Sequence, residues 1–333
     1  MRANLCHSDS RVQSCGGILY RNSTFRFVTV APVMPYTLLG PSTNSDRPVA
    51  SRVGLFGPVG TFKTTSIIET WPRKGCGGEK LVILSCPGEK GWETIPRNEP
   101  DLVPLIWEVE DVEKVSPHKV IKEVESAIAQ AVSGAYGPVT TFALDGVHKL
   151  YPWYFERALA DKVASPPKNW DGDEDKLVGP AYGQSHREFG LQLAKLSAAK
   201  IPYLVCTFWD SEERDDPKDR RKDAPTHLFP DLPGKMAKHV VGEFGAMLYC
   251  ETTLPDPRGR SRGTWLTRRE GRVWGASVKV PPAIGQTIPV RIPQHFEVLQ
   301  LYMGGNGLGA ATLVKAIQVS IPSITVPVRQ GGK

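Results

Sequence analysis

One fifteen-residue stretch, VGLFGPVGTFKTTSI at residues 53–67, constrains this chain more than any other. Its spacing matches the phosphate-loop template G-x-x-x-x-G-K-[ST] at Gly57, Lys63 and Thr64, but Phe62 stands where the template has its second glycine. The apolar run before the loop predicts a buried strand, and the residues from Lys63 onward predict a helix. The alternative is a Gly-Pro turn followed by a chance Lys-Thr pair.

The chemistry of such a loop follows from its backbone. The N–H groups of the loop and of the following helix N-terminus point inward and favour negative charge. We expect Lys63 to reach the β- and γ-phosphates of a nucleotide and the Thr64 hydroxyl to bind Mg²⁺, so that the expected ligands are ATP and Mg²⁺. The residues expected to bind the nucleotide are Gly57, Pro58, Val59, Gly60, Thr61, Phe62, Lys63, Thr64 and Thr65.

Phe62 is the departure from the template. Glycine at this place permits a positive φ and a close approach of the backbone to the phosphates, whereas a bulky side chain makes a positive φ costly. We expect the phenyl ring to point away from the phosphates, into the core beneath the loop. A ring that filled the phosphate pocket would contradict a nucleotide site.

A second motif, PVTTFALDG at residues 138–146, reads as a buried strand that ends in Asp145. We expect Asp145 to face the same cavity as Lys63 across adjacent strands and to hold the Mg²⁺ ion through water. Many buried strands end in Asp-Gly, so the motif gains its meaning from the phosphate loop.

Strand-like and helix-like segments alternate from the phosphate loop to about residue 208. The clearest helix lies between Ser116, its N-cap, and Gly134, its stop, and further helices are expected at about 152–163 and 182–199. Strands that alternate with helices predict an α/β fold with a mostly parallel sheet covered on both faces.

Three segments together resemble the RecA-like ATPases that bacteriophages encode: GPVGTFKTT, the FALDG strand end and LVCTFWDSEERDD. The resemblance covers roughly residues 50 to 280, and its two phosphate-site motifs are fairly specific to P-loop ATPases in general. Some phage recombinases also carry Phe before the motif lysine, which makes Phe62 a tolerated variant. The resemblance implies a RecA-like P-loop core extended by a C-terminal antiparallel β segment.

On this basis the chain divides into three parts. Residues 1–50, rich in Ser, Asn, Arg and Pro, are expected to be a poorly ordered extension. Residues 51–303 are expected to form the ATPase domain, with a β-rich extension at 244–303 that contains a hairpin around Glu270. Residues 304–333 are expected to be a C-terminal tail.

The resemblance also implies residues for hydrolysis. Many ring ATPases place a Glu directly after the magnesium Asp, where this chain has Gly146. RecA-like enzymes instead place this Glu at the end of the strand that follows the phosphate-loop helix. There Glu89 is the candidate and Glu93 a lesser one. The alternative is that Glu89 is only a solvated residue of a turn. A polar residue that senses the γ-phosphate is implied at the end of a later strand, at Thr207. The implied catalytic set is Lys63, Glu89, Asp145 and Thr207.

Partners are implied in the same way. The loop after the Thr207 strand would contact single-stranded DNA through Arg214, Lys218, Arg220, Arg221 and Lys222, although neighbouring Asp and Glu residues nearly cancel these charges and a solvated loop is the alternative. A neighbouring subunit of a ring or filament would add a cation to the site, for which Lys235, Arg268 and Arg269 are candidates.

The bulk composition agrees with this interpretation without requiring it. The formal net charge of +6 permits a polyanionic partner. None of the six cysteines forms a C-x-x-C pair, which argues against zinc, and Cys206 and Cys250 are expected to be buried thiols. No run approaches the ~20 apolar residues of a membrane-spanning helix, so we expect a soluble protein of the cytoplasm, that of the host cell if a phage encodes it.

Three functions remain open at this stage. The first is a phage-type RecA-like ATPase that acts in DNA recombination, replication or repair. The second is a P-loop motor for DNA packaging or partition. The third is a nucleotide-binding assembly protein that does not hydrolyse ATP.

Overall fold

The computed structural model describes residues 51–72, 80–96, 98–107, 115–168, 170–214, 226–252 and 263–320. The expected N-terminal extension at 1–50 lies outside these residues, as does the end of the expected tail from residue 321 onward. None of the described helices is long and apolar enough to cross a membrane.

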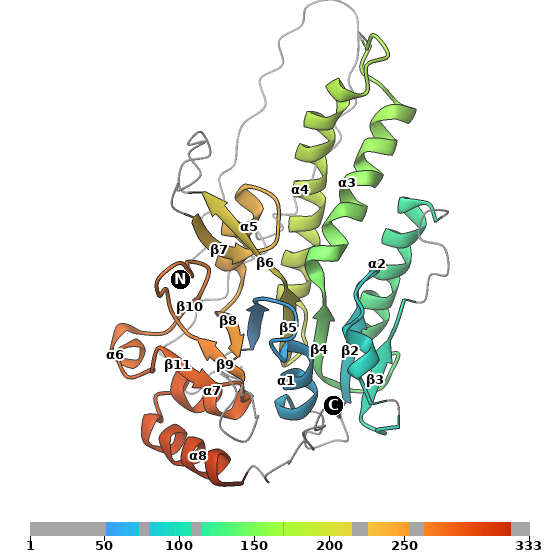
Figure 1. Cartoon of the computed structure of the whole chain (residues 1–333). Coiled ribbons are helices and arrows are strands. Elements are labelled where there is room, and N and C mark those ends of the chain that lie inside the picture. The colour runs from blue at the N-terminus through green and yellow to red at the C-terminus, as the bar shows by residue number, and fades with distance from the viewer. Residues whose placement is uncertain are drawn as a thin grey trace, which may run out of the picture. The chain divides into compact units, whose positions relative to one another are not determined.

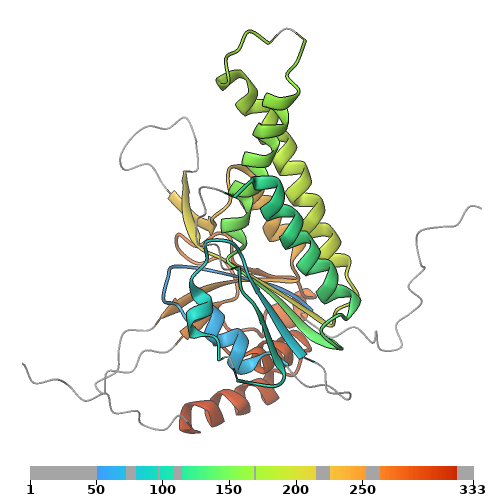
Figure 2. The same cartoon turned by 90° about the vertical axis from the view of Figure 1, so that its right-hand side faces the viewer.

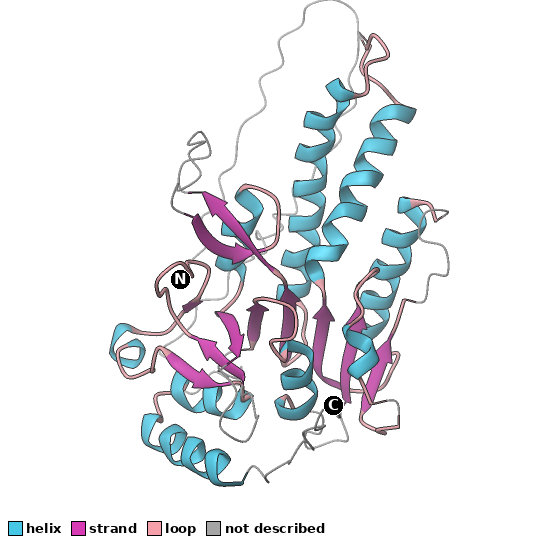
Figure 3. Cartoon of the chain, in the orientation of Figure 1, coloured by secondary structure: helices cyan, strands magenta, loops and turns pink. Residues whose placement is uncertain are grey.

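A nine-stranded sheet organises the described part of the chain, in the order β11-β9-β8-β1-β5-β4-β2-β3, with β10 paired to β8 (Figures 1 and 3). Six strands are parallel: β1 (Arg52–Phe56), β2 (Lys80–Ser85), β3 (Leu102–Leu105), β4 (Val139–Asp145), β5 (Tyr203–Phe208) and β8 (Ala246–Thr252). Three join antiparallel: β9 (Gly263–Leu266), β10 (Ser277–Val278) and β11 (Arg291–Pro293). The predicted α/β class with a mainly parallel sheet and an antiparallel extension is confirmed.

Helices cover both faces of this sheet, as a parallel sheet requires. The longer ones are α1 (Lys63–Thr70), α2 (Pro117–Ser133), α3 (Val147–Ala164), α4 (Asp175–Ala198), α5 (Lys235–Glu243), α7 (Phe296–Met303) and α8 (Gly307–Ser320). Two short turns, the 3₁₀ helix η1 (Gly91–Thr94) and α6 (Pro282–Gly285), complete the set. Helices α3 and α4 run side by side (Figures 1 and 2).

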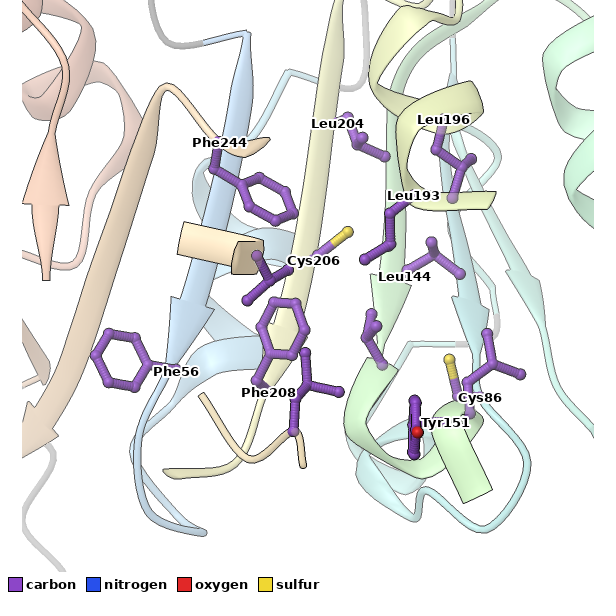
Figure 4. Packing of buried hydrophobic residues seen from close by; sticks show 14 of the residues in the cluster. Phe56, Cys86, Leu144, Tyr151, Leu193, Leu196, Leu204, Cys206, Phe208 and Phe244 are labelled. Atoms are coloured by element: carbon purple, nitrogen blue, oxygen red, sulfur yellow. The ribbon is translucent and has the colours of Figure 1, made fainter. Parts of the chain in front are cut away.

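Successive residues of the strands alternate between two hydrophobic clusters, because neighbouring side chains of a strand point to opposite faces. Val82 and Leu84 belong to the cluster that packs under α2, α3, α4 and α5 (Figure 4). Leu81 and Ile83 belong to the cluster that packs under α1, α7 and α8. The sheet therefore has no solvent-facing side along β1, β2, β4 and β5, which is why these strands read as continuous apolar runs.

The helix expected between Ser116 and Gly134 is present as α2, and Gly134 ends it in the left-handed conformation with φ of 81°. Helix α4 begins at Asp175 rather than near residue 182, and α3 begins at Val147 rather than near 152. Both therefore extend one to two turns further toward their N-termini than predicted, because each helix contains a proline near the predicted start, Pro152 in α3 and Pro180 in α4.

Pairing between strands differs from the expectation in two places. Residues after β5 form an antiparallel pair, β6 (Asp210–Arg214) with β7 (Thr226–Pro230), where a polar loop was predicted. The predicted hairpin around Glu270 is present only as a tight turn, in which Glu270 and Val273 form an isolated antiparallel bridge through two backbone hydrogen bonds. The strand before the turn, β9, pairs with β8 and β11 rather than with the residues that follow the turn. Distant partners therefore decide how the strands pair, while the local turn residues set only the turn.

Part of the expected tail is helical. Helix α8 lies within residues 304–333, and its Ala310 is fully buried in the cluster under α7, with Leu313 and Val314 packed against it. The assignment of 304–320 to a tail is therefore corrected: this segment has an apolar face that covers α7.

Arg52 ties the start of β1 to the end of α4. Its guanidinium donates to the carbonyl oxygens of Ser197 at 2.8 Å, Ala199 at 2.7 Å and Ile201 at 3.0 Å. These carbonyls lie at a helix C-terminus, where no intrahelical N–H is available to them. A planar five-donor group is suited to three carbonyls at once.

We predict that Arg52→Ala lowers the free energy of unfolding by about 2–4 kcal/mol, since several charge-assisted hydrogen bonds are lost together. The stability of Arg52→Lys should lie between that of the unmodified protein and that of Arg52→Ala, because an ammonium cannot reproduce the planar arrangement of donors in the guanidinium. Urea unfolding followed by circular dichroism measures this, with Arg187→Ala on the exposed face of α4 as the control. Equal stability of Arg52→Ala and the control would contradict the assigned role.

Candidate functional site

A cavity of about 740 Å³ opens beside the loop that joins β1 to α1. Figure 1 shows where β1 and α1 lie in the sheet. Crevices at the carboxyl ends of parallel strands are where open α/β sheets bind ligands. The residues that line the cavity are Val59, Gly60, Thr61, Phe62, Lys63, Thr64, Thr65, Gly88, Glu89, Lys90, Gly91, Asp145, Lys149, Thr207 and Trp209. The four residues expected to act in hydrolysis are all among them.

Phe62 has a left-handed backbone with φ of 59° and ψ of 22° at the N-cap of α1. Among the described residues it is the one non-glycine with a positive φ, so the loop adopts the glycine conformation of the template despite its side chain. The ring does not enter the core as expected: it is 42% exposed and lies at the rim of the cavity. The cavity beside it stays open, so the ring does not fill the space that phosphates would need.

Lys63 opens α1 and folds back over the loop. Its ammonium donates to the carbonyl oxygens of Gly57 at 2.8 Å and Pro58 at 2.7 Å and to the Thr61 hydroxyl at 3.2 Å. Burial lowers the pKa of Lys63, opposed by the nearby Asp145 and Glu89 carboxylates. The loop thus holds a positive charge at its centre.

Asp145 ends β4 and is only 2% exposed. It accepts hydrogen bonds from the Thr64 hydroxyl at 3.0 Å and from the Thr207 hydroxyl at 2.6 Å. Burial raises the pKa of Asp145, and the two hydroxyl donors oppose that rise. Asp145 and the phosphate loop therefore face one cavity, but not across adjacent strands, because β5 lies between β1 and β4.

Thr207 stands at the end of that intervening strand. Its hydroxyl donates to Asp145 and accepts from the backbone N–H of Gly146 at 2.7 Å. The hydroxyl proton is thus engaged by the carboxylate. In this structure Thr207 orients Asp145 rather than presenting a donor to the cavity.

Glu89 follows β2, the neighbour of β4 on its other side. Its Oε1 accepts from the backbone N–H groups of Lys90 at 3.1 Å and Gly91 at 3.2 Å. A Cβ added at Gly146 would lie 2.7 Å from Glu89 Oε2. Gly146 therefore leaves room for the Glu89 side chain to lie beside Asp145. Glu93, the lesser candidate, is exposed and does not line the cavity.

Four residues near the cavity were not anticipated as site residues. Gly91 comes so close that an added Cβ would lie 2.6 Å from Asp145 Oδ2 and 3.1 Å from Thr64 Oγ1. On α3, the Lys149 ammonium lies 4.0 Å from the ring centroid of Trp209, which was expected only to pack, and the His148 ring packs against the same ring at a tilt of 31°. A basic residue one turn after the Asp145 strand was the available signal for Lys149.

Of the expected cations that the structure describes, none lines this cavity within the same chain. Arg214 lies on β6 and Lys235 begins α5. Arg268 donates to the carbonyl of Ile288, and Arg269 lies over the ring of Trp274. The remaining expected DNA contacts, Lys218, Arg220, Arg221 and Lys222, lie outside the described residues.

The oxygen atoms around Asp145 fit a magnesium ion. A hydroxyl and a carboxylate lie within 3.0 Å of each other beside an open cavity, and both are the hard donors that Mg²⁺ prefers. Mg²⁺ is commonly held by one or two protein oxygens, water and substrate phosphates, so a small donor set is sufficient. Within the described residues, no cluster of three His, Cys, Asp or Glu side chains has the arrangement of an all-protein metal site.

No family model matches this chain, and no curated protein matches it. Its fold is similar to that of an ATPase from the type III secretion system of pathogenic bacteria, at 12% identity over 81% of this chain and 64% of that one, with a TM-score of 0.39. It is also similar to the flagellar accessory protein FlaH from Methanocaldococcus jannaschii (11% identity, 66% and 78% covered, TM-score 0.30). A third similar structure is the ATPase EscN from the type III secretion system of enteropathogenic E. coli, at 15% identity over 61% of this chain and 43% of that one, with a TM-score of 0.35.

This chain spans less than two thirds of both secretion ATPase chains. Similarity at this level concerns the fold alone and does not decide between functions.

The strained backbone of Phe62 yields a prediction. Phe62→Gly should change the free energy of unfolding by less than about 1 kcal/mol, because relief of a left-handed conformation worth about 1–2 kcal/mol offsets the lost contacts of a partly exposed ring. Phe62→Val should be about 2 kcal/mol less stable than Phe62→Gly, because a β-branched side chain is poorly accommodated there. Urea unfolding compares the two; equal stability would contradict the strained conformation.

Proposed function

We propose that the protein binds ATP with Mg²⁺ and hydrolyses it to ADP and phosphate. The observation that carries this proposal is the hydrogen bond between Thr64 and Asp145, which joins the start of the phosphate-loop helix to a buried carboxylate. A Gly-Pro turn followed by a chance Lys-Thr pair would not be expected to place Thr64 in contact with a buried carboxylate, that of Asp145.

Binding starts from the positive end of the loop. The N-terminus of α1 and the loop N–H groups favour phosphate oxygens, and the Lys63 ammonium adds a full positive charge in a half-enclosed cavity. Lys63 exchanges its bonds to the Gly57 and Pro58 carbonyls for bonds to the β- and γ-phosphates. The cavity volume of about 740 Å³ is within the range of small-molecule sites.

Mg²⁺ would neutralise the charge that develops on the β- and γ-phosphates. The Thr64 hydroxyl would bind the ion, and Asp145 would hold it through water. Thr207 keeps the Asp145 carboxylate in a single orientation. The raised pKa that burial gives Asp145 is offset once a divalent cation lies beside it.

Hydrolysis needs a group that orients the attacking water. Glu89 is our candidate, because it lines the same cavity beside Asp145 and is only 14% exposed at its side chain. Backbone donors from Lys90 and Gly91 fix one carboxylate oxygen. This leaves Glu89 held in place next to the phosphates, as a positioned base must be.

We further propose that the ATP cycle acts on DNA, in recombination, replication or repair, and that the active form is a homo-oligomer. The support is the resemblance of three segments to phage RecA-like ATPases, together with the net charge of +6. Stimulation of turnover by single-stranded DNA, and salt-dependent retention on it, test this part. ATP turnover that single-stranded DNA does not stimulate, in a protein that is not retained on such DNA, would indicate an ATPase with another role, such as a packaging motor.

Lys63→Ala is predicted to weaken ATP·Mg²⁺ binding by at least about 100-fold, since it removes a buried charge-assisted contact to phosphate. Isothermal titration calorimetry measures the affinity. Lys200→Ala, at the opposite end of β5 and exposed, is the matched control and should bind as the unmodified protein does. Equal affinity of the two variants would contradict the phosphate loop.

Glu89→Gln is predicted to keep ATP affinity and to lose at least about 100-fold in turnover, because the amide cannot accept the water proton. Phosphate release measures it, and Glu93→Gln, exposed and outside the cavity, should retain full activity. Unchanged turnover in Glu89→Gln would move the water-activating role to another residue. Tight binding with no turnover in the unmodified protein, even with single-stranded DNA, would instead favour a nucleotide-ordered assembly protein.

A further inference from the structure

His148 occupies the first turn of α3, which directly follows β4, and is only 6% exposed. Its ring packs against that of Trp209 with centroids 4.6 Å apart and planes tilted by 31°. Trp209 in turn lines the nucleotide cavity. A buried imidazole is therefore packed against a residue that faces the proposed ligand.

The tautomer of this imidazole follows from its contacts. The backbone N–H of Trp209 donates to His148 Nδ1 at 3.3 Å, so Nδ1 carries the lone pair. Burial, with help from the charges of Lys149 and Lys63, lowers the pKa of His148 to about 3, so the ring is neutral at physiological pH. The ring hydrogen is therefore on Nε2.

That hydrogen has no hydrogen-bond partner among the described residues, although Nε2 is fully buried. The nearest carboxylate oxygen is Glu89 Oε2, at 3.9 Å. This distance is too long for a hydrogen bond, and a neutral ring forms no ion pair there. A buried donor left without an acceptor is destabilising, which favours any movement that closes the gap.

We propose that His148 is a positioning residue for Glu89: in the nucleotide-bound protein, His148 Nε2–H donates to Glu89 Oε2 and sets the direction in which the carboxylate faces the attacking water. The inference rests on the proposed ATPase function. Catalytic hydrogen bonds are often long without substrate and shorten in the complex.

The two oxygens of Glu89 then have separate partners. Oε1 already accepts from the Lys90 and Gly91 backbone, and Oε2 accepts from His148. Because His148 packs against Trp209, which lines the cavity, a nucleotide bound there lies beside the ring that supports His148. Occupancy of the cavity and the orientation of Glu89 are thereby connected through two rings.

Two substitutions separate the contacts of His148. In His148→Gln the side-chain amide reaches as far as Nε2 and can donate to Glu89. In His148→Asn the amide lies at the place of Nδ1, so it can accept from the Trp209 N–H but does not reach Glu89. Both variants remove the ring, so loss of stacking is common to them.

We expect His148→Gln to keep kcat for ATP within about threefold of the unmodified protein and His148→Asn to lower kcat by about 10–100-fold, with KM and ATP affinity changed by less than about threefold in both. In a Glu89→Gln background, His148→Asn should lower turnover no further, since the residue it positions is already inactive. Thermal unfolding of each variant verifies that it is folded.

Equal kcat for His148→Asn and the unmodified protein would overturn the inference and leave the ATPase intact. An equal loss in both variants, or a further loss in the Glu89→Gln background, would assign His148 a merely structural role. Absence of turnover in the unmodified protein would overturn the proposed function, and this inference with it.

Discussion

The buried carboxylate of Asp145 is the group on which the rest of this site depends. Two hydroxyl donors, from Thr64 on α1 and Thr207 on β5, stabilise it at the end of β4. A charge in such a place is expensive unless hydrogen bonds or a cation compensate it. The compensating donors come from two separate elements, so α1, β5 and β4 are held in one arrangement around one cavity.

The sheet makes that arrangement possible. Burial on both faces fixes the register of β1, β5 and β4, since a one-residue slip would exchange their two sets of apolar side chains. Their ends therefore meet at a common edge, with Leu55 opposite Thr207 and Ser85 opposite Asp145. Glu89 reaches the same edge from β2 because residue 146 is glycine and leaves the space beside Asp145 free.

Local patterns in the sequence were sufficient to predict the strand and the helix on either side of the loop at 57–62, the strand that ends in Asp145 and the helix closed by Gly134. Each of these depends on neighbours within a few residues. The orientation of Phe62 could not be predicted in this way, because its backbone conformation turns the ring outward to the rim. Local patterns also could not predict three features that depend on distant partners. These are the place of β5 between β1 and β4, the pairing of β6 with β7 and the packing of α8. His148 was missed for the same reason: nothing in its local sequence indicates that Trp209 and Glu89 lie on either side of it.

The central claim is that Thr64 and Asp145 hold a divalent cation on the phosphates of a bound nucleotide. Electron paramagnetic resonance of Mn²⁺, which can replace Mg²⁺, tests it most directly in the presence of ATP. The account predicts one tightly bound Mn²⁺ per chain with hyperfine coupling to phosphorus, displaced by Mg²⁺ and lost when Thr64→Val and Asp145→Asn are combined. A Mn²⁺ signal without phosphorus coupling, or one that the double substitution leaves unchanged, would contradict it.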